Sequence, residues 1–298
     1  MPALEHRLSS RAVPIYAGIC LSVLLWHPVT FGQSAAWVRT GGPSGGLGYD
    51  IRARPDNPDV MYVTDAYAGV HKSIDGGLTW TELPTGFVRG TRVTDLRVDP
   101  SNPSTIYAGT FGLLTAGGSN YLETQYGVLK SVDSGETWTS MKTGLGADLR
   151  HQAIFRLDLS PRDPSRLIVS VGDTSYYLSS DGAATFARPA APTSQTGIMQ
   201  FDPTDAAGKR IVGLSQSGTQ IVESLDAGNT WRAIGTLPIE MQNNGDPSRP
   251  TGIRPSDIAI SHQNPRVVYL SGSHGSVYRT GDGGVTWRKV LSGTSLPQ

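Results

Sequence analysis

The sequence predicts an all-β protein, a β-propeller built from five repeats of a four-stranded antiparallel sheet. Three observations predict it: a motif of eight residues that recurs five times, a strand–turn–strand pattern that recurs in phase with the motif, and 36 Gly and 20 Pro residues among 298. A four-stranded sheet has two faces to cover, and radial stacking of many such sheets covers both faces without leaving long edges.

The recurring motif has the form Ser-x-Asp-x-Gly-x-Thr-Trp. Full copies lie at residues 73–80, 131–138 and 224–231, and weaker copies lie at 179–186 and 280–287. The Asp can accept backbone N–H groups across a tight turn, the Gly allows a positive φ, and the Trp ring can cover the turn. These tasks are structural, so a structural role is expected for the five central aspartates: Asp75, Asp133, Asp181, Asp226 and Asp282.

A strand–turn–strand pattern precedes each motif. In the first copy, strands at 50–54 and 60–63 flank a turn at 55–58 that is rich in Pro, Asn and Asp, as such turns usually are. A third strand then leads into the motif, which forms a hairpin turn, and a fourth strand follows it. The repeats are expected at 37–90, 91–146, 147–194, 195–250 and 251–298, within one domain at 37–298. Two arrangements stay open, a closed ring of five blades and an open or truncated propeller.

Composition excludes several classes of function. The 25 basic residues balance the 25 acidic ones, so no basic surplus favours nucleic acid as a partner. The four histidines after residue 36 are His71, His151, His262 and His274. They are scattered without metal-ligand spacing, which favours surface positions for them. We expect no metal and no cofactor.

The first 36 residues predict a cleaved secretory signal. Arg7 and Arg11 precede an uncharged stretch at 12–26, and small residues follow at 34–36. The uncharged stretch is too short to span a bilayer, although an uncleaved anchor is the alternative. Cleavage would remove Cys20, the single cysteine, and would leave no thiol and no membrane span. The expected location is therefore secreted or periplasmic.

The eight-residue motif resembles the Asp-box, or bacterial neuraminidase repeat. This repeat is found in sialidases, sortilin-type receptors, xyloglucan-cleaving glycoside hydrolases and photosystem II assembly factors, and the resemblance covers residues 37–298. It implies a propeller fold strongly and a function only weakly. It also implies that the Asp-box turns lie on the face opposite the usual ligand face.

Loops at the other end of the blades are the expected binding sites, because function usually sits on variable loops. They join second to third strands and one blade to the next, and two of them are long, at 111–125 and 233–255. The candidate ligand-binding residues in these loops are Tyr67, Tyr121, Glu123, Asp148, Arg150, His151, Asp173, Tyr176 and His274.

Asp65 is the candidate catalytic residue. The run 62–65, Gly69 and the first Asp-box resemble the first blade of the xyloglucan-cleaving hydrolases, and the resemblance implies that Asp65 is a general base. Inverting hydrolysis needs a second carboxylic acid across the sugar. In that family the acid comes from a second propeller, for which this chain is too short; Glu123 or Asp173 could stand in. The Arg-Ile-Pro segment of sialidases does not occur.

Charged residues alternate with apolar ones along each predicted inner strand. A period of two places the charges on one side of the strand, near the central channel. Structural ion pairs between blades are expected there. The alternative is a polar ligand at the channel mouth, with Asp50, Asp95, Arg156 and Asp257 as the nearest groups.

These features predict an exported, non-catalytic propeller that binds a protein or a glycan through its loops in a scaffold or assembly role. The alternative is a glycoside hydrolase of the xyloglucan-cleaving type that uses Asp65. If the ring is open, an uncovered blade edge would also favour self-association.

Overall fold

The structure is a computed structural model that describes residues 48–65, 69–83, 92–111, 127–145, 154–171, 175–189, 195–215, 218–238, 241 and 255–291. All of them lie in the second of two units into which the chain divides, Arg39–Gln298. The segment 1–36 expected to be a signal lies outside the described residues. Within the described ranges, no helix is long and apolar enough to cross a membrane.

The described strands form five antiparallel sheets. Blade 1 contains β1 (Gly48–Ala53), β2 (Met61–Asp65), β3 (Gly69–Ser73) and β4 (Thr81–Glu82); blade 2 contains β5 (Arg92–Val98), β6 (Ile106–Phe111), β7 (Gly127–Ser131) and β8 (Thr139–Met141). Blade 3 contains β9 (Ile154–Leu159), β10 (Leu167–Val171) and β11 (Ser175–Ser179). Blade 4 contains β12 (Gln195–Phe201), β13 (Ile211–Ser215), β14 (Gln220–Ser224) and β15 (Arg232–Thr236); blade 5 contains β16 (Pro255–Ile260), β17 (Val268–Gly272), the 3-10 turn η3 (Ser273–Gly275), β18 (Ser276–Thr280) and β19 (Arg288–Leu291).

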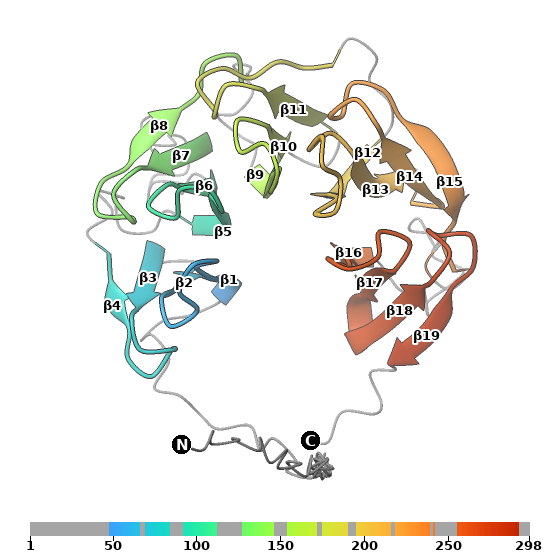
Figure 1. Ribbon diagram of the computed structural model, residues 1–298, viewed down its shortest axis with the longest axis horizontal. Helices are drawn as coiled ribbons and strands as arrows, with labels where there is room; N and C mark the ends of the chain where they lie inside the picture. Colours follow the sequence, from blue (N-terminus) through green and yellow to red (C-terminus); the bar gives the residue numbers. More distant parts are fainter. Residues whose placement is uncertain are drawn as a thin grey trace, which may run out of the picture. The chain divides into compact units, whose positions relative to one another are not determined.

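The blades are arranged around a central axis, with β1, β5, β9, β12 and β16 innermost (Figure 1). This arrangement confirms the predicted β-propeller. Consecutive blades lie side by side from blade 1 to blade 5.

Blade 3 departs from the expected four strands. Its outermost position holds a single bridge between Leu178 and Ala187 instead of a fourth strand. The reason lies in the sequence after the third Asp-box, where Pro189 follows two residues after Ala187. Proline has no N–H to donate to a strand ladder, so the pairing that Ala187 begins does not extend.

The apolar core lies between blades. We call the face of a blade that packs on the next blade in sequence its trailing face, and the face that packs on the preceding blade its leading face. At the first junction, Tyr62 and Val70 of blade 1 pack with Leu96 and Ile106 of blade 2. Three further buried clusters fill the junctions between blades 2 and 3, 3 and 4, and 4 and 5. Burial between neighbours is therefore what joins the repeats.

Each Asp-box closes its turn through one carboxylate and one hydroxyl. In the first box, Asp75 Oδ1 accepts the Thr79 N–H at 2.9 Å, and Asp75 Oδ2 accepts the Thr79 hydroxyl at 2.6 Å. Ser73 Oγ accepts the Gly77 N–H at 2.9 Å and donates to Asp75 Oδ1 at 2.7 Å. These bonds lower the pKa of Asp75 to about 2, so the carboxylate stays ionised at neutral pH.

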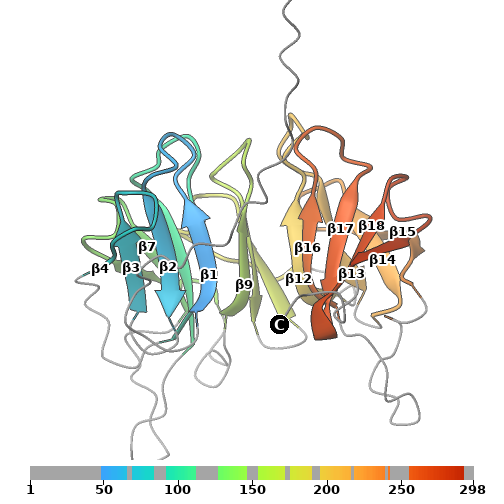
Figure 2. The ribbon, with the colours of Figure 1, turned by 90° about the horizontal axis from the view of Figure 1, so that it is seen from below.

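The same bonds recur around the other four aspartates: Asp133, Asp181, Asp226 and Asp282. Their turns lie at one end of the blades, as expected. In blade 1 the Gly76 N–H donates to the Asp59 carbonyl in the β1–β2 turn at 2.9 Å, and each of the other blades has an equivalent bond. Figure 2 shows these coloured turns together at one end of the strands.

Every Asp-box contains two consecutive residues with positive φ, where the sequence predicted one. In blade 2 the pair is Ser134 at φ 63° and Gly135 at φ 94°. A side chain other than glycine at such a backbone conformation costs roughly 1–2 kcal/mol. The turn geometry therefore imposes strain at Ser134, Ala183 and Ala227, which all have positive φ.

We expect Ser134→Gly to raise the free energy of unfolding by about 0.5–1 kcal/mol. Glycine relieves the backbone strain at φ 63°, and the larger conformational entropy of the unfolded glycine variant offsets part of this gain. The matched control is Thr139→Gly in β8, where the same substitution in a strand should lower stability. Chemical denaturation measures both. A loss of stability in both variants would show that the turn does not strain Ser134.

Candidate functional site

Side-chain oxygens on the inner strands bind the backbone of the next inner strand. Asp50 Oδ2 accepts the Leu96 N–H at 3.0 Å, and Asp95 Oδ2 accepts the Leu157 N–H at 2.9 Å. Farther along the ring, Asp158 Oδ2 accepts the Phe201 N–H at 2.6 Å, and Gln200 Oε1 accepts the Ile260 N–H at 2.8 Å. Each of the four junctions therefore has one such bond.

Arg97 holds the carboxylates of the first three blades together. Its Nε donates to Asp158 at 2.8 Å, its Nη1 lies 3.3 Å from Asp50, and it also binds Asp95. Arg52 Nε adds a bond to Asp50 at 3.0 Å. The predicted ion pairs between blades are thus confirmed for the junctions of blades 1, 2 and 3.

The charges in this cluster do not balance, because three carboxylates surround two guanidinium groups. Burial and the nearby charge of Asp95 raise the pKa of Asp50 to about 7. Burial opposes the charged form of Asp95, but the charges of Arg97 and Arg52 and the hydrogen bonds from Asp50 and the Leu157 N–H together outweigh it and lower the pKa of Asp95. A proton held on Asp50 would make the cluster neutral, which is the favoured state for buried groups.

Two other channel residues that could meet a ligand are bonded to each other. Arg156 on β9 lies 3.5 Å from Asp257 on β16, and its guanidinium also donates to the Ser256 carbonyl. The Asp257 side chain is 61% exposed. Asp50 and Asp95 are committed to the blade junctions, so a ligand at the channel mouth would meet Arg156 and Asp257 first.

Asp65 is the last residue of β2, at the end of the blade opposite the Asp-box. We call this end of the blades the loop end. It pairs with Gly48 of β1 and Gly69 of β3, and only 4% of its surface is exposed. A general base must reach a water molecule and the substrate. In this structure the backbone places Asp65 at the loop end, but its carboxylate has little access to solvent.

Tyr176 has a structural position that the sequence did not predict. It lies near the start of β11 on the trailing face of blade 3. Its hydroxyl donates to the Gly228 carbonyl at 3.0 Å and accepts the Trp231 Nε1–H at 3.0 Å, and the two rings meet edge to face. Tyr176 therefore binds the Asp-box of blade 4, while a role in ligand binding stays a prediction.

For the other candidate loop residues, ligand binding stays a prediction. His274 lies in η3, at the loop end of blade 5. Outside the described residues lie Tyr67, Tyr121, Glu123, Asp148, Arg150, His151 and Asp173. Most of the long segments 111–125 and 233–255 lies outside them as well. The described strand ends nevertheless show where these loops attach, since β2, β6, β10, β13 and β17 all end opposite the Asp-boxes.

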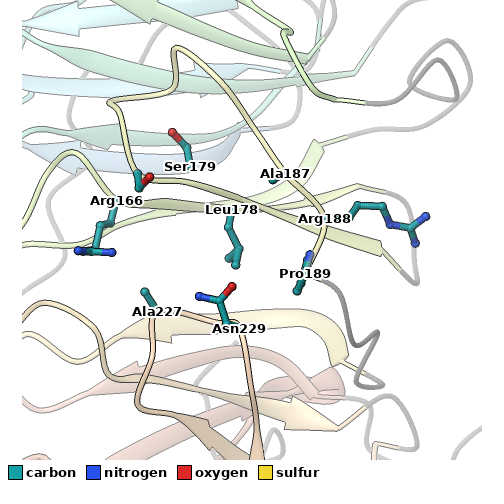
Figure 3. Close-up of a pocket in the computed structure, with 9 residues that line it drawn as sticks. Arg166, Leu178, Ser179, Ala187, Arg188, Pro189, Ala227 and Asn229 are labelled. Atoms are coloured by element: carbon teal, nitrogen blue, oxygen red, sulfur yellow. The ribbon is translucent and has the colours of Figure 1, made fainter.

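A pocket that the sequence analysis missed lies between blades 3 and 4, beside the Asp-box turns. Its volume is about 250 Å³. Leu178 and Asn229 face each other across it, while the guanidinium groups of Arg166 and Arg188 lie on opposite sides and do not converge (Figure 3). Among the described residues, blade 3 has no fourth strand beside this space. Its sequence signals are Pro189 and the departure of the third box from the motif, with Ala183 and Phe186 in place of Gly and Trp.

His71 corrects the expectation that the histidines lie on the surface. It is buried in β3, and its Nδ1 has no hydrogen-bond partner among the described residues. Its pairing with Val63 and Glu82 across the strands explains the burial, because β3 lies inside the sheet. No group of three or more His, Cys, Asp or Glu residues that could hold a metal ion occurs in the described part of the chain.

We expect Arg97→Met to lower the free energy of unfolding by about 3–5 kcal/mol, because it leaves three carboxylates without their shared cation. The matched control is Arg54→Met, which removes the exposed pair with Asp56 and should cost far less. Urea denaturation measures both losses. Equal losses would mean that the cluster contributes no more than a surface ion pair.

Asp50 should make stability depend on pH. Its folded pKa of about 7 lies above its ordinary value of 3.8, so the folded state holds the extra proton and stability falls as pH rises from about 4 to 7. Asp50→Asn keeps an oxygen for the Leu96 N–H and removes the titration. The melting temperature of Asp50→Asn minus that of the unchanged protein should therefore increase from pH 4.5 to pH 7.5. A constant difference between the two proteins would contradict a raised pKa.

Comparison with known proteins relates the chain to xyloglucanases. No family model matches it. It is 25% identical over 261 residues to the oligoxyloglucan-reducing end-specific xyloglucanase of Emericella nidulans, an alignment that covers 80% of this chain and 29% of that protein. The chain spans 17–29% of the length of the curated relatives that it matches.

Solved structures show the same fold. An ancestral GH74 enzyme matches with a TM-score of 0.60 at 17% identity, over 85% of this chain and 32% of that one. The GH74 enzyme of Niastella koreensis matches with a TM-score of 0.58 at 19% identity, over 83% of this chain and 38% of that one. The chain is therefore an Asp-box β-propeller, similar in sequence to xyloglucanases and in fold to a GH74 enzyme.

Proposed function

We propose that this chain is a non-catalytic binding propeller whose ligand face is the loop end of the blades. The observation that carries the proposal is the position of Asp65, which lies at that end but is 96% covered. Three of the acids that the sequence puts near the inner channel, Asp50, Asp95 and Asp158, serve the blade junctions. Such a propeller offers a rigid frame for binding loops.

A polysaccharide of the β-glucan class is the ligand that the comparisons support best. The sequence relatives are named for xyloglucan. A propeller that keeps the binding loops of a hydrolase but lacks its catalytic acid would still bind the polysaccharide. Polar loop side chains and aromatic rings, of the kind found at residues 121–123, suit a sugar polymer. We also propose that the protein is exported, because residues 1–36 have the pattern of a secretory signal.

Xyloglucan hydrolysis is the second candidate, because Thr64-Asp65 ends β2 at the loop end, where the resemblance puts a general base. Inverting hydrolysis would need a second carboxyl group about 6.5–9.5 Å away. That acid would have to come from a loop outside the described residues.

One experiment separates the two functions. The purified protein is mixed with xyloglucan and with barley β-glucan, and both the bound fraction and the release of reducing ends are measured. We expect retention by at least one polymer with no release of reducing ends, and equal retention by Asp65→Asn, since a buried acid contributes little to a surface site.

Release of reducing ends that Asp65→Asn abolishes would establish the hydrolase instead. Absence of retention by both polymers would remove the glycan ligand and leave a protein partner. A loop-end variant such as His274→Ala should change retention, whereas Asp56→Ala at the opposite end serves as the control and should not.

A further inference from the structure

A pocket of about 250 Å³ lies between blades 3 and 4, beside the Asp-box turns and at the end of the blades opposite the loop end. On the blade 3 side it is lined by Leu178 of β11, which pairs with Ile168 of β10 and bridges to Ala187. On the blade 4 side, Asn229 faces Leu178 (Figure 3). Asn229 is the sixth residue of its Asp-box, so the pocket lies where one blade meets the Asp-box of the next.

Long charged side chains stand at the position of Leu178 in other blades. Each directly precedes its Asp-box and pairs with the second residue of the preceding strand: Lys72 in blade 1, Lys130 in blade 2 and Glu223 in blade 4. Lys130 Nζ crosses the junction and donates to the carbonyl of Gly182, the fourth residue of the next Asp-box, at 2.9 Å. The fourth residue of the box after Leu178 is Ala227, which lines the pocket. The pocket therefore lies in space that a lysine side chain takes at the junction of blades 2 and 3.

The size and the lining of the pocket favour one apolar side chain as its occupant. Binding sites for whole small molecules are typically about 300–1,000 Å³, which is larger than this pocket. Leu178, Ala227 and Pro189 supply apolar surface, and Leu178 packs against the buried cluster of this junction while it stays partly exposed. An apolar side chain placed here would take that surface out of water, which favours binding. A side chain of a larger partner therefore fits better than a complete metabolite.

Two arginines at the rim specify the charge of the occupant. The guanidinium groups of Arg166 and Arg188 lie on opposite sides of the pocket and do not converge (Figure 3). One small anion such as phosphate would therefore not meet both of them. Two carboxylates, one on each side of the inserted apolar side chain, would each meet a guanidinium, which binds carboxylates through strong charge-assisted hydrogen bonds. The pattern that fits is acidic, apolar, acidic.

The polar groups of the pocket are already held in place. Arg166 Nε donates to Asp163 Oδ2 at 2.7 Å, which leaves its two Nη groups to a second carboxylate. The Arg188 guanidinium lies 5.8 Å from the ring centre of Tyr177. Asn229 Nδ2 donates to a carbonyl of its own turn at 2.7 Å, so its side-chain oxygen can accept an N–H from the occupant. Groups that are ordered before binding lose little conformational freedom on binding.

We propose that this pocket binds an acidic segment of a partner protein. The segment inserts one apolar side chain against Leu178, and it donates a backbone N–H to Asn229 Oδ1. It places one carboxylate beside Arg166 and another beside Arg188. This surface is separate from the ligand face at the loop end, so the inference goes beyond the function proposed above. A neutral polysaccharide offers neither arginine a charge, which is why the pocket is assigned to a protein segment and not to a second glycan.

Nuclear magnetic resonance of the full chain, with its leucine methyl groups labelled, tests the pocket directly. The probe is the acetylated and amidated peptide Asp-Asp-Leu-Asp-Asp, and the methyl signals of Leu178 report its binding. We expect these signals to shift and to saturate at millimolar peptide, because one anchored side chain buries little area. A peptide with serine in place of leucine should bind at least about tenfold more weakly. A peptide with lysine in place of every aspartate should cause no shift.

Variants separate insertion into the pocket from attraction by charge. Leu178→Lys introduces the side chain that blades 1 and 2 carry at this position, so it adds a positive charge but fills the pocket. Followed through the signals of the peptide, this variant should bind at least about tenfold more weakly. Arg166→Gln and Arg188→Gln should each weaken binding about two- to fivefold, as loss of an exposed ion pair does. The matched control is Arg266→Gln, which removes an exposed arginine from the β16–β17 turn of blade 5 and should leave binding unchanged.

Other results would overturn the proposal. Leu178 signals that the acidic peptide leaves unmoved would show that the pocket takes no such segment, and a shift caused by cellohexaose would assign the pocket to a glycan. Equal binding of the serine peptide, or tighter binding by Leu178→Lys, would show attraction by charge without insertion. If Leu178→Lys does not fold, the serine peptide and Arg188→Gln still test the same contacts. None of these measurements depends on retention of polysaccharide at the loop end, so failure here is distinguishable from failure of the proposed function.

Discussion

A side-chain oxygen on one inner strand accepts a backbone N–H on the next, and the propeller depends on this bond at all four junctions. Each inner strand is the edge of its own sheet, so half of its backbone N–H groups point away from that sheet. An unpaired N–H at such a position would cost free energy when the next blade packs over it. The bond removes this cost and also fixes how each blade is aligned with the next.

Satisfying these N–H groups with carboxylates brings a second requirement. Asp50, Asp95 and Asp158 are close together, and without a cation their mutual repulsion and their burial would oppose packing. Arg97 meets this requirement for all three. The later junction between blades 4 and 5 uses the neutral Gln200 and needs no cation. Three of the four junctions thus use a carboxylate, and the fourth uses a neutral amide.

The fold was predictable because its signals are periodic. The Asp-box and the alternation of inner strands recur five times, and each copy supports the others. Departures within one copy were not predictable in the same way. Tyr176 was assigned to a loop because it follows Asp173 closely, and only the pairing of β10 with β11 puts it within a strand. The left-handed conformation of Ser134 and Ala227 also overrides the usual preference of these residues.

The candidate site was less predictable, since loops lack a repeating pattern and their side chains are placed by contacts that no spacing records. Asp65 is the last residue of β2, and its burial depends on neighbouring strands that its sequence motif does not record. The pocket between blades 3 and 4 arises from a strand that is missing, and a motif search looks for residues that are present.

In the described part of the chain, the outer edge of blade 3 has no regular fourth strand, and such edges bear on aggregation. Beyond the single Leu178–Ala187 bridge, β11 is the outermost strand of its sheet, and the edges of sheets are where chains pair wrongly and begin to aggregate. Two neighbours work against this: Pro189 cannot extend a ladder, and Arg188 puts a charge beside the edge. Both are gatekeepers in the sense used for aggregation-prone segments. A homologue that replaced both with β-branched residues would gain a regular fourth strand or a tendency to form intermolecular sheets.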